Sequence, residues 1–97
     1  MTRRTGVPEE ALRFGAWLKK ARRIRGMSQA ELAAEAGISG AEITYIENGK
    51  RSPTFAMAMK LVRGLRYRMV FVTEEELDRK ISGAMERIRQ RKEAEDE

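Results

Sequence analysis

The chain has 97 residues, a net charge of +5 and a pI of about 10.0, with 20 lysines and arginines against 15 acidic residues. It contains no cysteine and no histidine; this excludes a disulfide framework, cysteine-ligated metal sites and nucleophile systems that need an imidazole base. A chain of this length forms one domain with one small core, and we expect no enzyme activity, metal or cofactor.

The positive charge is clustered, which makes it informative about binding. Basic residues gather at Arg3–Arg4, Lys19 to Arg25, Lys50–Arg51, Arg66 to Arg68 and Arg87 to Lys92. Nucleic acid is the natural partner of such clusters. A solvated helix face is the alternative interpretation, above all for Arg87 to Lys92, which precedes an acidic tail at residues 93–97.

The hydrophobic pattern predicts a cytoplasmic protein without membrane contact. The longest unbroken apolar run, Met69 to Val72, is far shorter than a membrane span. The N-terminal residues contain no hydrophobic signal region.

The first predicted helix runs from Pro8 to Arg25 and follows a flexible arm at residues 1–7. Phe14, Leu18 and Ala21 form its apolar face, and Gly26 ends it. Trp17 is expected to pack against Val7 or against the C-terminal helix, with a contact to a partner protein as the alternative.

Two short helices follow, and each begins with a capping box. In the pairs Ser28 with Glu31 and Ser39 with Glu42, hydroxyl and carboxylate are expected to satisfy free amides at the helix start. The second helix ends at Gly37, and the third helix, which carries Ile43 and Ile46, ends at Asn48–Gly49. Two short helices joined in this way predict a helix-turn-helix, with Ala33 and Gly37 allowing close approach at the turn.

A fourth helix is predicted after the turn, capped by Thr54 and ending near Gly64. Its expected inward residues are Phe55, Ala58, Met59, Val62 and Leu65. Together with the helices before it, this forms a DNA-binding domain at residues 8–65.

The hydrophobic period then changes, and Arg66 to Val72 is predicted to be a strand. A single strand cannot satisfy its own backbone, so the same segment of a second molecule is its expected partner. A helix from Thr73 to Lys92 follows, with a narrow apolar stripe. Residues 66–92 are therefore assigned to dimerisation or partner binding; the expected dimer residues are Tyr67, Met69, Val70, Phe71, Leu77 and Ile81.

The segment from Met27 to Thr54 resembles the Xre/Cro type of helix-turn-helix found in lambdoid phage repressors and many antitoxins. The resemblance covers about Phe14 to Leu65, and among the matching residues are Gly15, Arg22, Gln29, Gly37, Glu47 and Pro53. It implies a mainly α, lambda-repressor-like helix-turn-helix bundle, here with one short C-terminal strand paired between subunits and a C-terminal helix.

The resemblance also implies roles for individual residues. Gln29 is expected to contact a phosphate, and Arg22 and Glu47 are expected to form a structural ion pair. Asn48, Lys50 and Arg51 resemble a loop that contacts the DNA backbone, while the base-contacting positions hold Ser39, Gly40, Ala41, Thr44 and Tyr45. Relatives often carry glutamine, asparagine or lysine at the first of these. We therefore expect modest direct readout, with specificity depending on dimer spacing and DNA shape.

The segment from Lys60 to Glu76 is similar to the C-terminal end of HipB-type antitoxins, whose strand pairs across the dimer. The expected function is that of a homodimeric, sequence-specific DNA-binding regulator that represses its own operon through a palindromic operator on double-stranded DNA. The alternative is an antitoxin whose main role is to bind a toxin, a kinase or a ribonuclease, in which case the C-terminal apolar stripe would contact that toxin.

Overall fold

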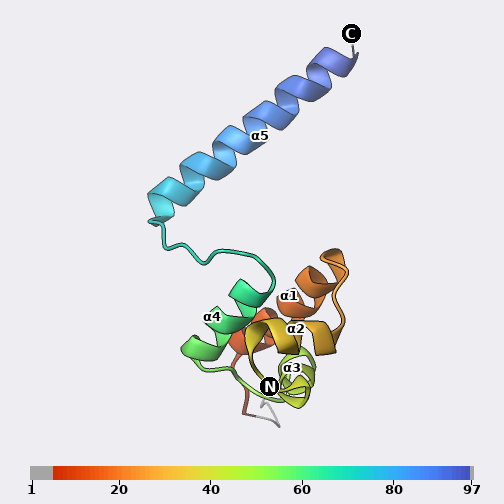
Figure 1. Cartoon of the computed structure of the whole chain (residues 1–97). Coiled ribbons are helices and arrows are strands. Elements are labelled where there is room, and N and C mark those ends of the chain that lie inside the picture. The colour runs from red at the N-terminus through yellow and green to blue at the C-terminus, as the bar shows by residue number, and fades with distance from the viewer. Residues whose placement is uncertain (1–5, 97) are drawn as a thin grey trace.

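The computed structural model describes residues 6–96, which fold into five helices (Figure 1). The helices are α1 (Glu9–Ile24), α2 (Gln29–Ala36), α3 (Gly40–Glu47), α4 (Phe55–Gly64) and α5 (Glu74–Asp96). Helices α1 to α4 gather into one body, from which a linker leads to the separate helix α5. The predicted basic point at Arg3–Arg4 lies outside the described residues.

Most helix starts follow the predicted capping residues. Ser28 and Glu31 form the complete capping box, with the Glu31 amide donating to Ser28 Oγ over 3.0 Å and the Ser28 amide donating to Glu31 Oε1 over 2.9 Å. Thr54 caps α4 by accepting from the amide of Met57. Pro8, predicted as the first helical residue, is the N-cap of α1. The capping pattern thus locates the helix boundaries to within a residue or two.

The core lies between α1, α2, α3 and α4. Its fully buried large side chains are Leu18, Leu32, Ile43, Ile46, Leu61 and Leu65. In α4, the prediction that Phe55 and Met59 point inward is wrong, because both are exposed while Leu61 and Val62 are buried. The buried stripe of α4 occupies its C-terminal half, where the helix packs against α2.

Gly15 is the glycine that a close helix approach requires. A Cβ atom there would lie 2.1 Å from the carbonyl oxygen of Ile46, so α1 and α3 contact each other through backbone at this point. Gly37 has a different role from the one predicted. Nothing lies within 4 Å of the Cβ position at Gly37, and its φ of +71° shows that it is required for the left-handed turn after α2.

The predicted strand at residues 66–72 is not present as a strand within the described residues 6–96. Arg66 has a φ of 67° and belongs to the end of α4, where the amide of Tyr67 donates to the carbonyl of Val62 over 3.0 Å. The residues after it form an extended linker without a ladder. A single chain offers no second segment to pair with, so a strand here needs a partner.

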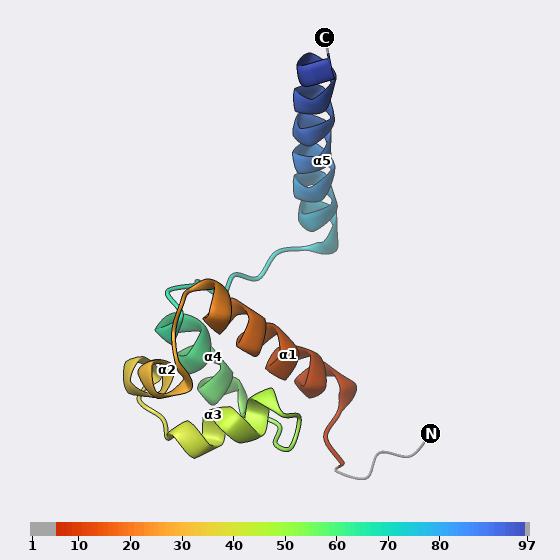
Figure 2. The same cartoon turned by 90° about the vertical axis from the view of Figure 1, so that its right-hand side faces the viewer.

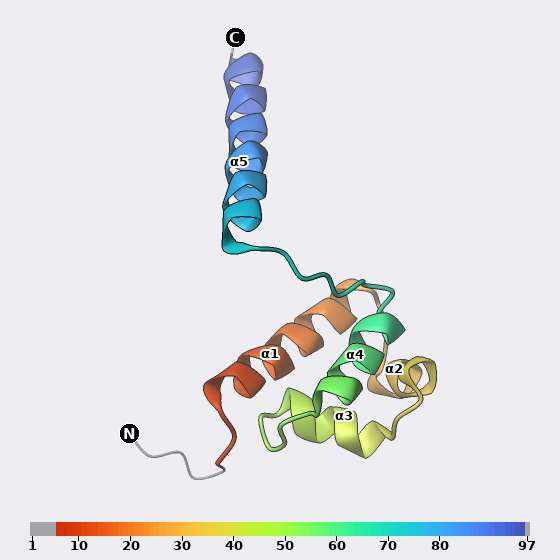
Figure 3. The same ribbon diagram turned by 90° about the vertical axis from the view of Figure 1, so that its left-hand side faces the viewer.

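Helix α5 projects away from the body, and α3 lies at the opposite end of the molecule in two perpendicular views (Figures 1 and 2). Figure 3 shows the same separation from the other side. The helix continues to Asp96, beyond the predicted end at Lys92, so most of the predicted acidic tail is helical. Among residues 6–96, no helix has the length and apolar character needed to cross a membrane.

Candidate nucleic-acid interface

Helices α2 and α3 form the predicted helix-turn-helix, and α3 exposes one ridge to solvent. Ala41, Tyr45 and Asn48 are exposed along this ridge, at spacings that place them on one face of the helix. Ile43 and Ile46 occupy the opposite face and are completely buried. The apolar packing therefore determines which side of α3 is free to contact a groove.

A buried hydrogen-bond network fixes α3 to the rest of the body. Arg22 of α1 donates to the Glu47 carboxylate twice, from Nε to Oε2 over 2.7 Å and from Nη2 to Oε1 over 3.0 Å. Arg22 Nη1 also donates to the carbonyl of Met27, in the turn before α2, over 2.8 Å. This is the ion pair that the family resemblance implied, and it joins α1, the first turn and α3.

Gln29 extends the network to α2. Its Nε2 donates to Glu47 Oε1 over 3.0 Å, and its Oε1 accepts a hydrogen bond of 2.9 Å from the hydroxyl of Thr44. The same hydroxyl lies 3.1 Å from the carbonyl oxygen of Gly40. The oxygen and the nitrogen of the Gln29 amide, and the hydroxyl proton of Thr44, therefore make hydrogen bonds inside the protein. These bonds orient α2 relative to α3, the helices predicted to contact a phosphate and the bases, respectively.

The network also determines the charge state of its members. Burial alone would raise the pKa of the Glu47 carboxyl, but hydrogen bonds from Arg22 and Gln29, together with the charges of Arg22 and Lys19, lower that pKa below its ordinary value. The hydrogen bond to Glu47 raises the pKa of the Arg22 guanidinium. Glu47 and Arg22 are thus a fully ionised pair at neutral pH.

Tyr45, Arg51 and Glu42 form a cluster on the exposed side of α3. The Arg51 guanidinium forms an ion pair with Glu42 Oε1 and lies 5.3 Å from the centre of the Tyr45 ring. Glu42 is therefore not the capping-box carboxylate that was predicted; its other oxygen, Oε2, is buried and has no hydrogen-bond partner among the described residues. Sequence spacing contains no signal for this contact, because it depends on how the turn after α3 folds back.

The start of α3 carries small side chains. The Ser39 hydroxyl accepts from the amide of Glu42 over 3.2 Å, and Ala41 is exposed. Nothing lies within 4 Å of the Cβ position at Gly40, so the protein itself does not require a glycine there. Because Gly40 and Ala41 are small, another molecule can approach the start of α3 closely.

The turn after α3 presents Asn48, Lys50 and Arg51, all of which are exposed. Gly49, with a φ of +71°, allows the Lys50 amide to donate back to the carbonyl of Tyr45 over 2.8 Å. Asn48 is the C-cap of α3. The turn is therefore closed by a backbone hydrogen bond, and it places two cationic side chains beside the exposed ridge.

The predicted dimer residues lie in the linker and on α5, and they differ in their surroundings. Tyr67 packs on Trp17 edge to face, with ring centres 5.6 Å apart, and lies beneath the Arg25 guanidinium at 4.8 Å. Trp17 also lies 5.7 Å from the Phe14 ring, so its aromatic neighbours are Phe14 and Tyr67; its packing against Val7 stays a prediction. Phe71 is 81% exposed and stacks on Phe55, with ring centres 6.4 Å apart.

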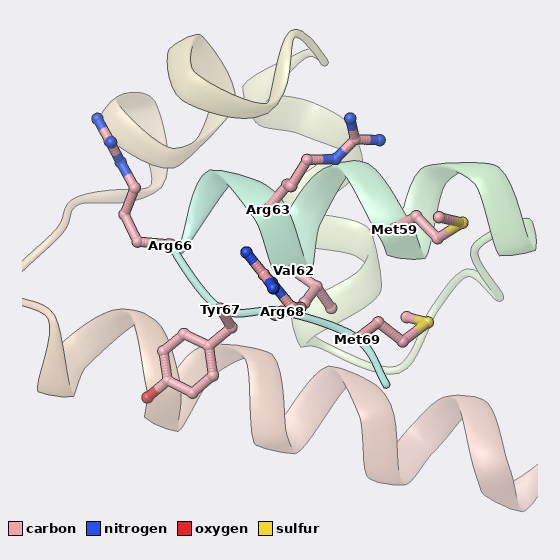
Figure 4. A pocket seen from close by; sticks show the side chains of 7 residues that line it. All are labelled: Met59, Val62, Arg63, Arg66, Tyr67, Arg68 and Met69. Carbon is pink, nitrogen blue, oxygen red and sulfur yellow. The ribbon is translucent and has the colours of Figure 1, made fainter. Parts of the chain in front are cut away.

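A groove separates α4 from the linker. It is lined by Met59, Val62, Arg63, Arg66, Tyr67, Arg68 and Met69. Figure 4 shows Met59 and Met69 extending in the same direction from the two sides, while Arg66 extends away from them. Val70 is exposed beyond the groove, as are Leu77 and Ile81 on α5. The structure thus leaves most of the predicted dimer residues uncovered in the single chain.

Comparison with known proteins agrees with this geometry. The profile of the helix-turn-helix family matches residues 18–72. An uncharacterized HTH-type transcriptional regulator of Bacillus subtilis strain 168, YqaF, is 44% identical over 45 residues, which are 46% of this chain and 59% of that protein. The chain therefore matches less than two thirds of that relative's length.

A solved structure is similar to a larger part of this chain. The crystal structure of the restriction-modification controller protein C.AhdI from Aeromonas hydrophila superposes with a TM-score of 0.60 at 26% sequence identity, covering 63% of this chain and 92% of that one. The matched family region contains the α2–α3 unit, its buried network and the exposed ridge. The chain belongs to the helix-turn-helix family, in its Xre-type group.

Proposed function

We propose that the chain is a sequence-specific transcriptional regulator that binds a palindromic operator as a homodimer and represses its own operon. The observation that carries the proposal is the ridge of α3, exposed on one side and held on the other by the network of Gln29, Thr44 and Glu47. A rigid helix of this kind enters a major groove without reordering. The chain acts in this proposal as a binding protein and not as an enzyme.

The ridge divides into two kinds of contact. Gly40 and Ala41 let the start of α3 approach the bases closely, and Ala41 meets a thymine methyl group. Ser39 and Tyr45 supply hydrogen bonds, and Thr44, whose proton is engaged with Gln29, contributes its methyl group and remaining acceptor. For Tyr45 to reach a base, the Arg51 guanidinium moves from the Tyr45 ring to a phosphate.

Phosphate contacts position the helix. Lys50, Arg51 and Asn48 lie in the exposed turn after α3, and Gln29 stands at the amide-rich start of α2, where an anion is favoured. We expect Gln29 to offer its second amide proton while keeping its bond to Glu47. These contacts carry no sequence information of their own and set the register of the protein on the duplex.

The homodimer is proposed to use the apolar residues of the linker and of α5. Met69, Val70 and Phe71 lie in an extended segment that has unpaired backbone groups, and Leu77 and Ile81 are exposed on α5. Pairing two copies covers these residues. Tyr67 contributes indirectly, since its packing on Trp17 fixes the start of the linker.

Substitution at Gly40 tests the placement of α3. Because nothing within the protein lies near the Cβ position, Gly40→Ala is expected to keep or slightly raise the stability of the body, by up to about 1 kcal/mol. The same variant should bind a selected operator more weakly, because the methyl group stands between α3 and the bases. Undiminished binding by a normally folded Gly40→Ala variant would contradict the proposal.

A change in base preference distinguishes residues that contact bases from residues that contact phosphates. Tyr45→Ala is expected to relax preference at one or two positions of each half-site, at a cost of about 1–3 kcal/mol, whereas Lys50→Ala weakens all sequences alike. With about six or more phosphates neutralised per dimer, affinity should fall by orders of magnitude between low and physiological salt. A selection from random duplexes, repeated with each variant and titrated at several salt concentrations, measures both effects.

A role as an antitoxin is the second candidate, favoured by the exposed apolar face of α5. In that case the face covers a groove on a toxin, in the manner of an amphipathic helix. A gene for a kinase or ribonuclease beside this one, whose product forms a stable complex with the chain, is the observation that would favour this function over plain regulation. Loss of that complex on Ile81→Glu, with DNA binding kept, would locate the contact on α5.

A further inference from the structure

Helix α5 carries an apolar stripe that the described part of the chain does not cover. Leu77, Ile81, Met85 and Ile88 are 46%, 52%, 61% and 49% exposed. Leu77, Ile81, Ala84 and Ile88 follow one another at intervals of four, three and four residues, which is the spacing of a two-helix seam. The stripe lies on a helix that projects from the body (Figure 1). A helix exposing such a stripe needs a partner of matching shape.

The charges of α5 indicate which partner fits. Residues 74–82 carry four acidic side chains against Arg79 and Lys80, which leaves a net charge of −2, whereas residues 83–91 carry Arg87, Arg89 and Arg91 against Glu86, which leaves a net charge of +2. Two copies side by side in parallel would bring like charges together along both parts. Two copies in opposite directions bring the acidic part of each beside the basic part of the other. Another α5, antiparallel, is therefore complementary to this helix.

We infer that α5 pairs with α5 of a second copy in an antiparallel arrangement, with the two-fold axis between Ser82 and Gly83. In this register Leu77 packs against Ile88 of the second copy, and Ile81 packs against Ala84 of the second copy. The next layer outward places Glu74 beside Arg91 of the second copy. Ser82 and Gly83 stand level with the axis, but the spacing of the seam places them on the outer face of each helix.

The layers of the seam support the same orientation. In a parallel pair Ala84 would face Ala84, which leaves a thin layer beside the thick layers of two isoleucines. The parallel pair would also place Glu74 against Glu74 and Arg91 against Arg91. In the antiparallel pair Leu77 packs on Ile88 and Ile81 packs on Ala84. No layer then holds two alanines, so the layers differ less in thickness than in the parallel pair.

The pairing has a consequence for the proposed homodimer, on which it rests. The 17 helical steps from Glu74 to Arg91 rise about 25 Å at about 1.5 Å per residue, so the two α5 starts stand about that far apart, one at each end of the pair. A parallel pair would hold them about 8–10 Å apart. The linker then sets where each body lies relative to DNA.

Single cysteines test the orientation, because the chain has none of its own. In the antiparallel pair, Leu77→Cys lies beside Ile88→Cys of the second copy, but two copies of Leu77→Cys stand about 16 Å apart, too far for a disulfide. Mixing the two full-length variants under mild oxidation, without DNA, should give a cross-linked heterodimer, while each variant alone stays uncross-linked. A disulfide in Leu77→Cys alone, or none in any sample, overturns the inference.

Charge reversal provides a test that leaves the apolar residues of the seam unchanged. Replacing Glu74, Glu76 and Asp78 with lysine should raise the dimer dissociation constant at least about tenfold, as should replacing Arg87, Arg89 and Arg91 with glutamate. Both sets in one chain should restore wild-type association in sedimentation experiments. Equal association of all variants overturns the pairing. A wild-type chain that remains monomeric refutes the homodimer itself, and operator binding is then measured separately.

Discussion

The body and α5 both carry amphipathic helices, but they differ in what completes them. In the body, the stripes of α1, α3 and α4 meet one another and bury Leu18, Ile46 and Leu61 completely. On α5, Leu77 and Ile81 also recur at helical spacing, but they remain about half exposed. The comparison shows that hydrophobic periodicity predicts a helix and its apolar face, whereas the partner of that face depends on chain connections and on other molecules.

The two regions also use Glu–Arg pairs in different surroundings, and removing one carboxylate from each tests that difference. Glu47 is buried and accepts three hydrogen bonds, whereas Glu86 pairs with Arg89 on the surface of α5. Glu47→Ala leaves the Arg22 charge buried and is expected to lower the free energy of unfolding by about 3–5 kcal/mol. Glu86→Ala should change it by less than about 0.5 kcal/mol. Urea unfolding of both variants measures the contrast.

Acid should weaken the body through the same carboxyl. The pKa of Glu47 is lowered in the folded chain, so its contribution to stability is complete above the ordinary glutamate pKa and is lost as pH falls through the folded value. Unfolding midpoints across the acidic range should therefore fall for the wild type. In Glu47→Gln this part of the decrease should disappear; an identical acid profile in both proteins would show that other groups control it.

Glycine to alanine changes sharpen the comparison at a smaller scale. Gly15→Ala forces a methyl group against the Ile46 carbonyl and should destabilise the body by about 1–3 kcal/mol. At Gly83, the nearest atom to a new Cβ is the flexible Arg87 guanidinium at 3.5 Å, so Gly83→Ala should strengthen α5 by about 0.5–1 kcal/mol. Thermal unfolding followed by circular dichroism separates the two; destabilisation of similar size at both sites would mean that α5 packs on the body.

The smallest expected effect lies at the junction of the two regions. Trp17 is the only tryptophan, so its fluorescence reports on the Tyr67 ring beside it. Tyr67→Leu should shift this emission and cost about 0.5–1.5 kcal/mol, the value of an aromatic pair beyond its buried area. Phe71→Leu, whose contact is with Phe55, is the control and should leave the emission unchanged. A wild-type spectrum for Tyr67→Leu would mean that the linker start is not held on α1.

Much of the body was predictable because its signals are local. The Ser28 and Thr54 caps act on amides three residues away, and the glycines after α1, α2 and α3 adopt the positive φ that ends a helix, so these boundaries are encoded within a few residues. The buried faces of α1 and α3 follow from the helical period of their apolar residues. The α4 face was misjudged because its exposed Phe55 and Met59 are as hydrophobic as its buried Leu61.

The parts of the candidate interface that could not be predicted depend on distant residues. The bond between Glu42 and Arg51, the double role of Gln29 and the packing of Tyr67 on Trp17 each join residues from different elements. Arg66 was assigned to a strand by its neighbours' β propensity, yet it completes the end of α4. Local propensity is a weak preference, and tertiary hydrogen bonds override it.

The sequence by itself determined the number and order of the helices, most of their capped boundaries, the clustered positive charge and the membership of a helix-turn-helix group, because each of these depends on residue type at short spacing. Only the tertiary structure decided that Glu47, Gln29 and Thr44 form one network, that Gly15 is where α1 meets α3, and that α5 stands apart from the body. Those features arise where separate helices meet, and their geometry is fixed by packing and buried hydrogen bonds rather than by local preference.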